Sequence, residues 1–140
     1  MEDFTEEMQR VIEDSACPSP FVDNGRRVAR FRPIADVIEA GDAFFVLVEL
    51  PGLTRDDVLL EAHGNVLAVF GERKPPLDLE GAAFHAMERS YGCFSRRFEF
   101  PEDIDPMAVT ASMKSGLLNV RVPKRARRTV NRTIPVTADE

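Results

Sequence analysis

A chain of 140 residues of which 44% are apolar, with ten phenylalanines, can form one domain with its own hydrophobic core. The formal net charge of -6 at pH 7 argues against nucleic acid or an anionic membrane as the main partner. No apolar run approaches the roughly 20 residues that a membrane-spanning helix requires.

The start of the chain and the two cysteines bear on the cellular compartment. Residues 1–7 are acidic where a signal peptide would be basic, and no long apolar stretch follows, so we predict a cytoplasmic protein. Cys17 and Cys93 lie far apart in the sequence without a partner motif. In a reducing compartment this arrangement predicts two free thiols.

Residues 1–32 are predicted to form an arm that becomes ordered only against another surface. In residues 4–12, apolar side chains recur at helical spacing, and polar residues occupy the other face. A helix of about two or three turns is too short to be stable alone in water. Pro18, Pro20 and Gly25 then break the helix and signal a turn. The apolar residues that this arm could offer to other proteins are Phe4, Met8, Val11, Ile12 and Phe21.

The periodicity changes at Pro33, and residues 33–124 are predicted to form the folded domain. Short segments rich in β-branched and aromatic residues alternate with turns that contain Gly, Pro, Asn or Asp. The predicted strands are 34–39, 43–50, 58–62, 66–70, 94–100, 109–113 and 118–122. No long helical period lies between them, so the fold class is an all-β, antiparallel, immunoglobulin-like β-sandwich. Thr54 is expected to cap a single turn, and 74–81, with two consecutive prolines, is expected to be a loop.

Residues 125–140 form a polar, basic tail with a single apolar island, Ile134-Pro135-Val136. The two aliphatic side chains flank a proline and therefore project to the same side of an extended chain. Proline also lowers the entropy that is lost when the segment is held straight. Burial of both side chains is worth about 3–5 kcal/mol gross, much of it offset by ordering the tail. Such contacts are weak singly and strong when many act together in an assembly. The alternative is a chance apolar pair in a disordered tail.

Five short blocks resemble, in the right order, the small heat-shock protein family. They are Leu50–Gly52, Gly71–Arg73, Glu88–Phe98, Ala111–Lys124 and Ile134–Val136. The similarity covers about 33–124 and the tail motif. It implies an α-crystallin domain that dimerises and assembles into larger oligomers. It also implies an ATP-independent chaperone that holds unfolding client proteins until ATP-driven chaperones refold them.

The resemblance assigns the dimer interface to the long loop and to the first strand of the sandwich. A strand within the loop of one subunit would pair near Ile34 and Val37 of the other. That strand would consist of Phe84, His85, Ala86 and Met87. A short apolar segment beyond two prolines has no obvious local partner, which fits an exchanged edge strand; the alternative is an irregular loop. Arg96 matches the family's interface arginine, with Glu72 and Glu88 as possible partners.

By the same resemblance, Ile134 and Val136 would dock between strands 58–62 and 109–113 of a neighbouring subunit. The groove walls would be Val58, Leu60, Val109, Ala111 and Met113. For each of these residues the alternative is ordinary core packing. Leu59 is apolar at a position that the alternation places outward, so it is expected to add to a client or assembly surface.

The sequence offers no catalytic constellation, so we predict a protein that is not an enzyme and needs no cofactor. No nucleotide-binding loop occurs, the isolated His63 and His85 do not make a zinc site, and no base can be assigned to Cys93. Three rival functions remain. A p23-like co-chaperone with one fixed partner would not need the tail motif, an enzyme on a β-sandwich lacks a catalytic cluster, and membrane binding conflicts with the acidic face of the N-terminal helix.

Overall fold

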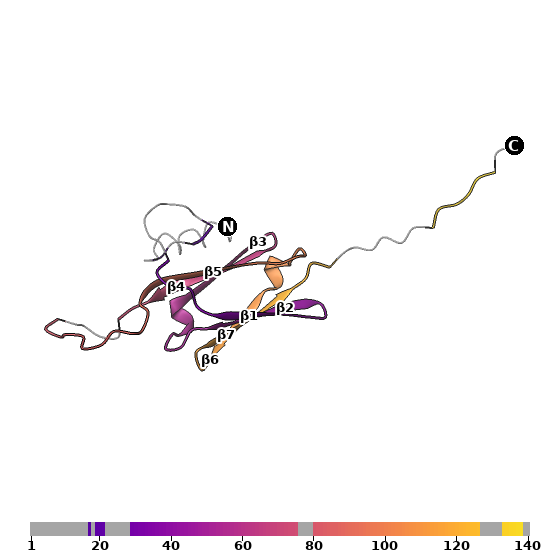
Figure 1. The fold of residues 1–140 in the computed structure, drawn as a ribbon. Coiled ribbons are helices and arrows are strands. Elements are labelled where there is room, and N and C mark those ends of the chain that lie inside the picture. The colour runs from indigo at the N-terminus through magenta and orange to yellow at the C-terminus, as the bar shows by residue number, and fades with distance from the viewer. Residues whose placement is uncertain (1–16, 18, 22–28, 76–79, 127–132, 139–140) are drawn as a thin grey trace, which may run out of the picture.

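Two antiparallel sheets stacked face to face make up the folded part of the chain (Figure 1). The computed structural model describes residues 17, 19–21, 29–75, 80–126 and 133–138. In these residues the larger sheet has the order β1-β2-β7-β6, formed by Ala35–Ala40, Ala43–Glu49, Leu117–Pro123 and Thr110–Lys114. The smaller sheet has the order β3-β4-β5, formed by Val58–His63, Val66–Arg73 and Gly92–Glu99. The antiparallel β-sandwich predicted from the sequence is confirmed.

The main core lies between the two sheets and follows from the period-two alternation of the strands. In β7, Leu118, Val120 and Val122 are buried, while the intervening Asn119 and Arg121 are exposed. The buried residues of this core are Phe44, Val46, Val48, Leu50, Leu67, Val69, Phe94, Phe98, Phe100, Ile104, Leu118, Val120 and Val122. As the alternation predicts, Phe94 and Phe98 of β5 and Phe100, which follows the strand, all belong to this core.

Two glycines explain local features of the sandwich. A Cβ on Gly71 in β4 would lie 2.1 Å from the carbonyl oxygen of Asp57 and 2.8 Å from the Phe94 ring, so this position allows no side chain. In the β6–β7 hairpin, Ser115 and Gly116 both have positive φ, 52° and 76°. Such two-residue turns match the right-handed twist of the flanking strands.

Two short 3-10 helices connect strands on either side of the core. The first, η1 (Arg55–Asp57), begins at Thr54, whose backbone N–H donates to Asp57 Oδ2 at 2.8 Å. The capped turn predicted at Thr54 is therefore confirmed. The second, η2 (Pro106–Ala108), follows Asp105, whose Oδ1 accepts a hydrogen bond from the backbone N–H of Met107 at 3.2 Å.

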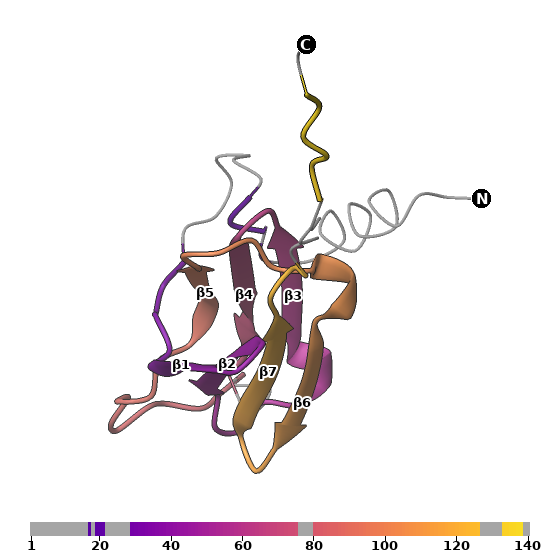
Figure 2. The same cartoon turned by 90° about the vertical axis from the view of Figure 1, so that its right-hand side faces the viewer.

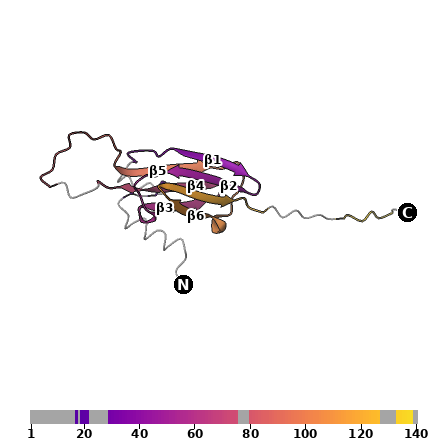
Figure 3. The ribbon, with the colours of Figure 1, turned by 90° about the horizontal axis from the view of Figure 1, so that it is seen from below.

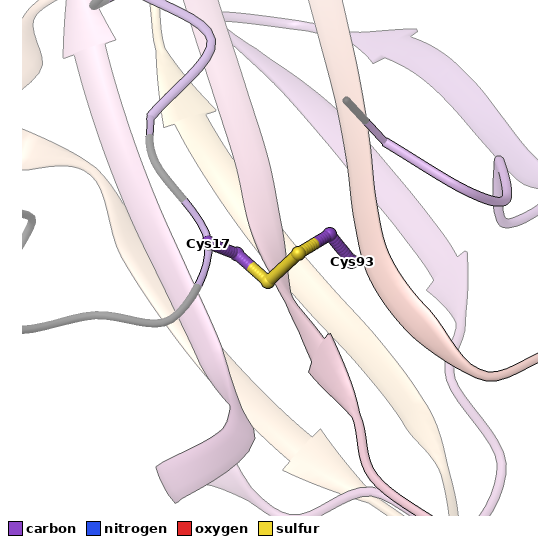
Figure 4. Close-up of a disulfide and its surroundings, with 2 residues drawn as sticks. All are labelled: Cys17 and Cys93. Carbon is purple, nitrogen blue, oxygen red and sulfur yellow. A yellow bond between two sulfur atoms is a disulfide. The ribbon is translucent and has the colours of Figure 1, made fainter. Parts of the chain in front are cut away.

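A disulfide joins the N-terminal arm to the sandwich, so the prediction of two free thiols is wrong. Cys17 is bonded to Cys93 in β5, and their Cα atoms lie 5.7 Å apart although 76 positions separate them in the sequence (Figure 4). The prediction rested on sequence spacing, which carries no information about which distant segments the fold brings together. Both cysteines are buried.

The predicted helix at 4–12 lies outside the described residues. No helix in the described ranges is long and apolar enough to span a membrane. The proposed division at 1–32, 33–124 and 125–140 stays a prediction.

Candidate functional site

The edge strands of the two sheets, β3 and β6, lie at the same side of the sandwich, and we call the line between them the β3–β6 seam (Figures 2 and 3). Five apolar side chains along it are partly buried and pack against the main core. They are Val58, Leu60, Ala62, Val109 and Met113. Because these side chains close the core without being fully covered, the seam presents aliphatic surface to solvent.

Four of the five predicted groove residues are in that set, and the fifth, Ala111, lies beside them. Ala111 is directly opposite Val120 in the register of β6 and β7, so it points to the same side of the sheet as that buried valine. Ala111 is exposed on this edge strand. The prediction had omitted Ala62, although the alternation through Val58 and Leu60 places it on the same face.

The tail motif is fully available for contacts. Ile134 is 72% exposed and Val136 is 95% exposed, in an extended segment that leads away from the sandwich (Figure 1). Pro135 between them is exposed as well. Neither aliphatic side chain is therefore docked on its own chain. Within the described residues, the seam is thus only partly covered and the tail motif is exposed in one copy.

A third uncovered region is the opposite edge of the larger sheet. β1 is the outermost strand of that sheet and pairs only with β2 among the described strands. Ile34 and Val37, both predicted at the interface, are 67% and 50% exposed. Ile38 is also exposed, at 46%, and was not among the predicted interface residues.

The long loop that was predicted to supply an exchanged strand is exposed and carries no strand over 80–90 in the single chain. Phe84 and Met87 are 50% and 65% exposed, and His85 and Ala86 are exposed as well. Exposure of two large apolar side chains to water is unfavourable, so their burial against another surface would lower the free energy. Their predicted pairing with β1 of another subunit stays a prediction.

Arg96 lies on the inward side of β5, between Phe94 and Phe98. Its Nη1 donates a hydrogen bond of 2.8 Å to the carbonyl oxygen of Pro33, and its guanidinium lies 4.8 Å from the centroid of the Phe98 ring. Partial burial and the nearby Arg32 lower the pKa of Arg96 from its usual value. In one copy Arg96 thus fixes the start of β1 to β5. Its predicted pairing with Glu72 or Glu88 across subunits stays untested.

The outer face of the smaller sheet carries an apolar cluster that sequence analysis did not anticipate. Ala68 and Phe70 of β4 point away from the main core and are fully buried, packed with Leu59 and Phe21. Leu59 therefore contacts other apolar side chains of this chain, where an open surface had been expected. Of the predicted client-binding arm, Phe4, Met8, Val11 and Ile12 lie outside the described residues.

In the described ranges, no group of three or more His, Cys, Asp or Glu residues is arranged to hold a metal ion. One group of charged residues among the described ranges centres on Lys124, whose side chain is 19% exposed. Lys124 Nζ lies 2.6 Å from Glu39 Oε1 and 3.5 Å from Glu102 Oε1. The hydrogen bond to Glu39 raises the pKa of Lys124. This pair ties the end of the last strand to β1.

The sequence profile of the Hsp20/alpha crystallin family matches residues 36–137, which include every strand except the first residue of β1. The chain belongs to the Hsp20/alpha crystallin family. The small heat-shock resemblance inferred from five short blocks is thereby confirmed. The matched range contains both strands of the seam and the tail motif.

Individual members of the Hsp20/alpha crystallin family show the same relationship. The small heat shock protein C4 of Rickettsia felis is 34% identical over 93 residues, covering 66% of this chain and 57% of its own length. The 22.7 kDa class IV heat shock protein of Pisum sativum is 40% identical over 87 residues, covering 61% of this chain and 44% of that protein. The matched region thus spans about half the length of these relatives.

Solved structures of the family agree with the fold. A small heat-shock protein from Xylella fastidiosa, described as having a distinct high order structure, has a TM-score of 0.66 and 34% identity, covering 79% of this chain and 100% of that chain. Heat shock protein 16.0 from Schizosaccharomyces pombe has a TM-score of 0.65 and 30% identity, covering 81% and 89%. The sandwich described above is thus an α-crystallin domain.

Proposed function

We propose that this protein is an ATP-independent chaperone that binds unfolding proteins through exposed apolar surface and prevents their aggregation, as a dynamic oligomer of dimers. The observation that carries the proposal is that one chain presents two apolar features, the β3–β6 seam and the tail motif, that do not contact each other. The β3–β6 seam presents partly buried aliphatic side chains, and Ile134 and Val136 are 72% and 95% exposed. Neither feature is satisfied within one copy, so both favour association.

Assembly follows if the tail of one subunit fills the seam of another. The seam is an edge-lined surface of the kind that accepts extended peptides, with side chains in sockets. Burial of Ile134 and Val136 supplies only a few kcal/mol after the tail is ordered. Each contact therefore opens and closes, while many contacts in one particle hold it together. Such an oligomer exchanges subunits readily.

The dimer within that oligomer is proposed to form at the opposite edge of the sandwich. There β1 presents an open edge and exposed aliphatic side chains, and the loop segment Phe84–Met87 has exposed apolar side chains of its own. Pairing the loop of each subunit with β1 of the other would satisfy both by strand addition. This arrangement leaves the seam free for tails.

Client capture in this proposal uses the same surfaces. Heat populates states in which tails have left the seams, because the docked and free states differ by little free energy. The vacated seams and the apolar residues of the arm then bind unfolding chains without directional or sequence requirements. Release and refolding fall to ATP-driven chaperones. The proposal places the protein in the cytoplasm, without nucleic-acid or membrane partners.

The assembly step is tested by light scattering on the full chain and on the double variant Ile134→Ala/Val136→Ala. The expected result is a fall from a large particle to a dimer. A matched control, Thr133→Ala/Thr137→Ala, alters the same tail without changing its aliphatic side chains and should leave the particle size unchanged. An equal particle size for all three proteins would contradict tail docking and favour a co-chaperone with one fixed partner.

The activity is tested by heating an aggregation-prone client with the protein in the absence of ATP. Turbidity should fall as the chaperone-to-client ratio rises, and light scattering should show soluble complexes of chaperone and client. A protein that leaves client aggregation unchanged at every ratio is not a holding chaperone.

A further inference from the structure

The smaller sheet has a second apolar surface on the side that faces away from the main core. We call Leu59, Ala68 and Phe70 the outer patch. Leu59 of β3 is directly opposite Phe70 of β4 in the strand register, and Ala68 lies two residues before Phe70, so all three share one face. Ala68 and Phe70 are 0% exposed, which a sheet surface facing solvent could not achieve. Something must cover them.

Among the described residues, the cover includes a short piece of the N-terminal arm, which we call the lid segment: Cys17 and Ser19–Phe21. Phe21 packs against the outer patch, with its ring centroid 4.4 Å from that of His63 and 5.2 Å from the guanidinium carbon of Arg97. Ser19 is 1% exposed, and its Oγ accepts a hydrogen bond of 3.1 Å from the backbone N–H of Phe21. The lid segment is therefore fitted to this face of the sheet.

The lid segment is held there by a covalent bond as well as by packing. The Cys17–Cys93 disulfide ties it to β5 (Figure 4). In the strand register, Cys93 lies opposite Glu72 of β4. Among the described residues, the packing contact recorded between the lid segment and the outer patch is that of one aromatic side chain, Phe21. The entropy lost by ordering each residue of an irregular segment is about 1–2 kcal/mol, so the packing of Phe21 alone has little surplus to hold the segment in place.

We infer that the Cys17–Cys93 disulfide is a redox clamp, and that its reduction frees the lid segment and opens the outer patch as an additional docking surface for unfolding chains. The step is a thiol–disulfide exchange. Two thiols of a cellular dithiol reductant become its disulfide, and two electrons and two protons pass to the sulfurs of Cys17 and Cys93. A disulfide compound with a higher reduction potential oxidises the two thiols again and reverses the step. Both cysteines are buried, so exchange requires a local opening that exposes the bond before the lid segment is released.

The lid segment itself indicates what the outer patch binds. It is an irregular, proline-containing stretch that inserts one aromatic side chain over Leu59 and Phe70. An unfolding protein presents such stretches in quantity, and apolar burial makes no demand on their sequence. The lid segment thus occupies the patch as a stand-in for a client. In its client-binding part, this inference rests on the proposed chaperone function.

The test compares the full chain in its air-oxidised and dithiothreitol-treated states. Thiol titration should find no reactive thiol in the first state and two in the second. The fluorescence of an apolar-surface dye should rise about twofold on reduction as the patch is uncovered, and amide hydrogen exchange should accelerate in β3 and β4. Cys17→Ser, which keeps Cys93 in β5, should show the high signal with or without reductant.

A matched pair of substitutions assigns the signal to the outer patch. Leu59→Gln should remove most of the gain in dye fluorescence on reduction, whereas Leu117→Gln, at an exposed leucine of β7 in the other sheet, should keep it. Two free thiols in the air-oxidised chain, or equal dye binding and exchange in both states, would overturn the redox clamp. The reduced state should also suppress client aggregation at a lower chaperone ratio than the oxidised state. Suppression in neither state, with the dye response intact, would refute the chaperone proposal and leave the clamp standing.

Discussion

Strand β3 carries apolar side chains on both of its faces, and the two faces are treated differently. Val58, Leu60 and Ala62 face the main core and end at the β3–β6 seam, where they stay partly exposed. Leu59 faces the other way, into the outer patch, where the chain supplies its own covalently attached cover. One surface is left for other molecules, and the other is closed within the molecule.

The contrast shows that one small domain can cover two apolar surfaces in two different ways, each released by a different condition. The seam is proposed to be filled by a tail through weak contacts, so temperature and concentration control its availability. The outer patch is filled by a segment on a disulfide, so its availability depends on redox conditions. Because side chains alternate along β3, neighbouring residues of this one strand contribute to the two different surfaces.

The strongest test of this difference removes one phenylalanine ring from the main core and one from the outer patch. Phe94→Ala empties a fully buried site in the main core and should lower the free energy of unfolding by about 3–5 kcal/mol in both redox states. Phe70→Ala should be equally destabilising in the oxidised chain. In the reduced chain its effect should fall to about 1–2 kcal/mol, because the lid segment no longer buries that ring.

Urea unfolding with and without dithiothreitol measures these differences, at one fixed protein concentration because assembly adds to apparent stability. If Phe70→Ala is as destabilising in the reduced chain as in the oxidised chain, the outer patch stays covered without the disulfide, and the distinction between the two surfaces fails.

A smaller effect is expected from the clamp itself. Cys17→Ser should lower the free energy of unfolding of the oxidised chain by about 2–4 kcal/mol, since a disulfide between residues 76 positions apart closes a long loop in the unfolded chain. In the presence of reductant, the variant and the unaltered chain should unfold at the same urea concentration. A difference that persists under reductant would show that Cys17 stabilises the fold by packing alone.

Most of the sandwich could be predicted from the sequence because its signals are local. The alternation of Leu118, Val120 and Val122 with polar residues identifies a strand and its buried face without knowledge of any neighbour. The turn before β3 was likewise predictable, since Thr54 and Asp57 are three residues apart and cap each other. That β3 and β6 end side by side is a property of topology, and it was expected here only through the family resemblance.

The packing of the lid segment on the outer patch could not be predicted, because these contacts join distant parts of the chain and leave no periodic pattern in the sequence. Alternation correctly placed Leu59 on the outward side, but it cannot say what covers that side. Phe21 and Cys17 belong to an irregular segment, and nothing in their spacing indicates that it lies on β4 and β5. The free-thiol prediction failed for the same reason, aided by an assumption about the compartment.

The most delicate test exchanges neighbouring leucines of β3 that differ only in the face they serve. Leu59→Ala and Leu60→Ala each remove a partly exposed side chain and should each lower the free energy of unfolding by about 1–2 kcal/mol. Their effects on function should separate. Leu60→Ala should loosen tail docking and shift the particle size measured by light scattering, while leaving the response to reductant unchanged. Leu59→Ala should keep the particle size and weaken the redox response. The two residues are adjacent and chemically identical. If both substitutions change particle size and the redox response in the same way, β3 contributes to a single surface. If each changes only one of the two measurements, the seam and the outer patch are separate surfaces.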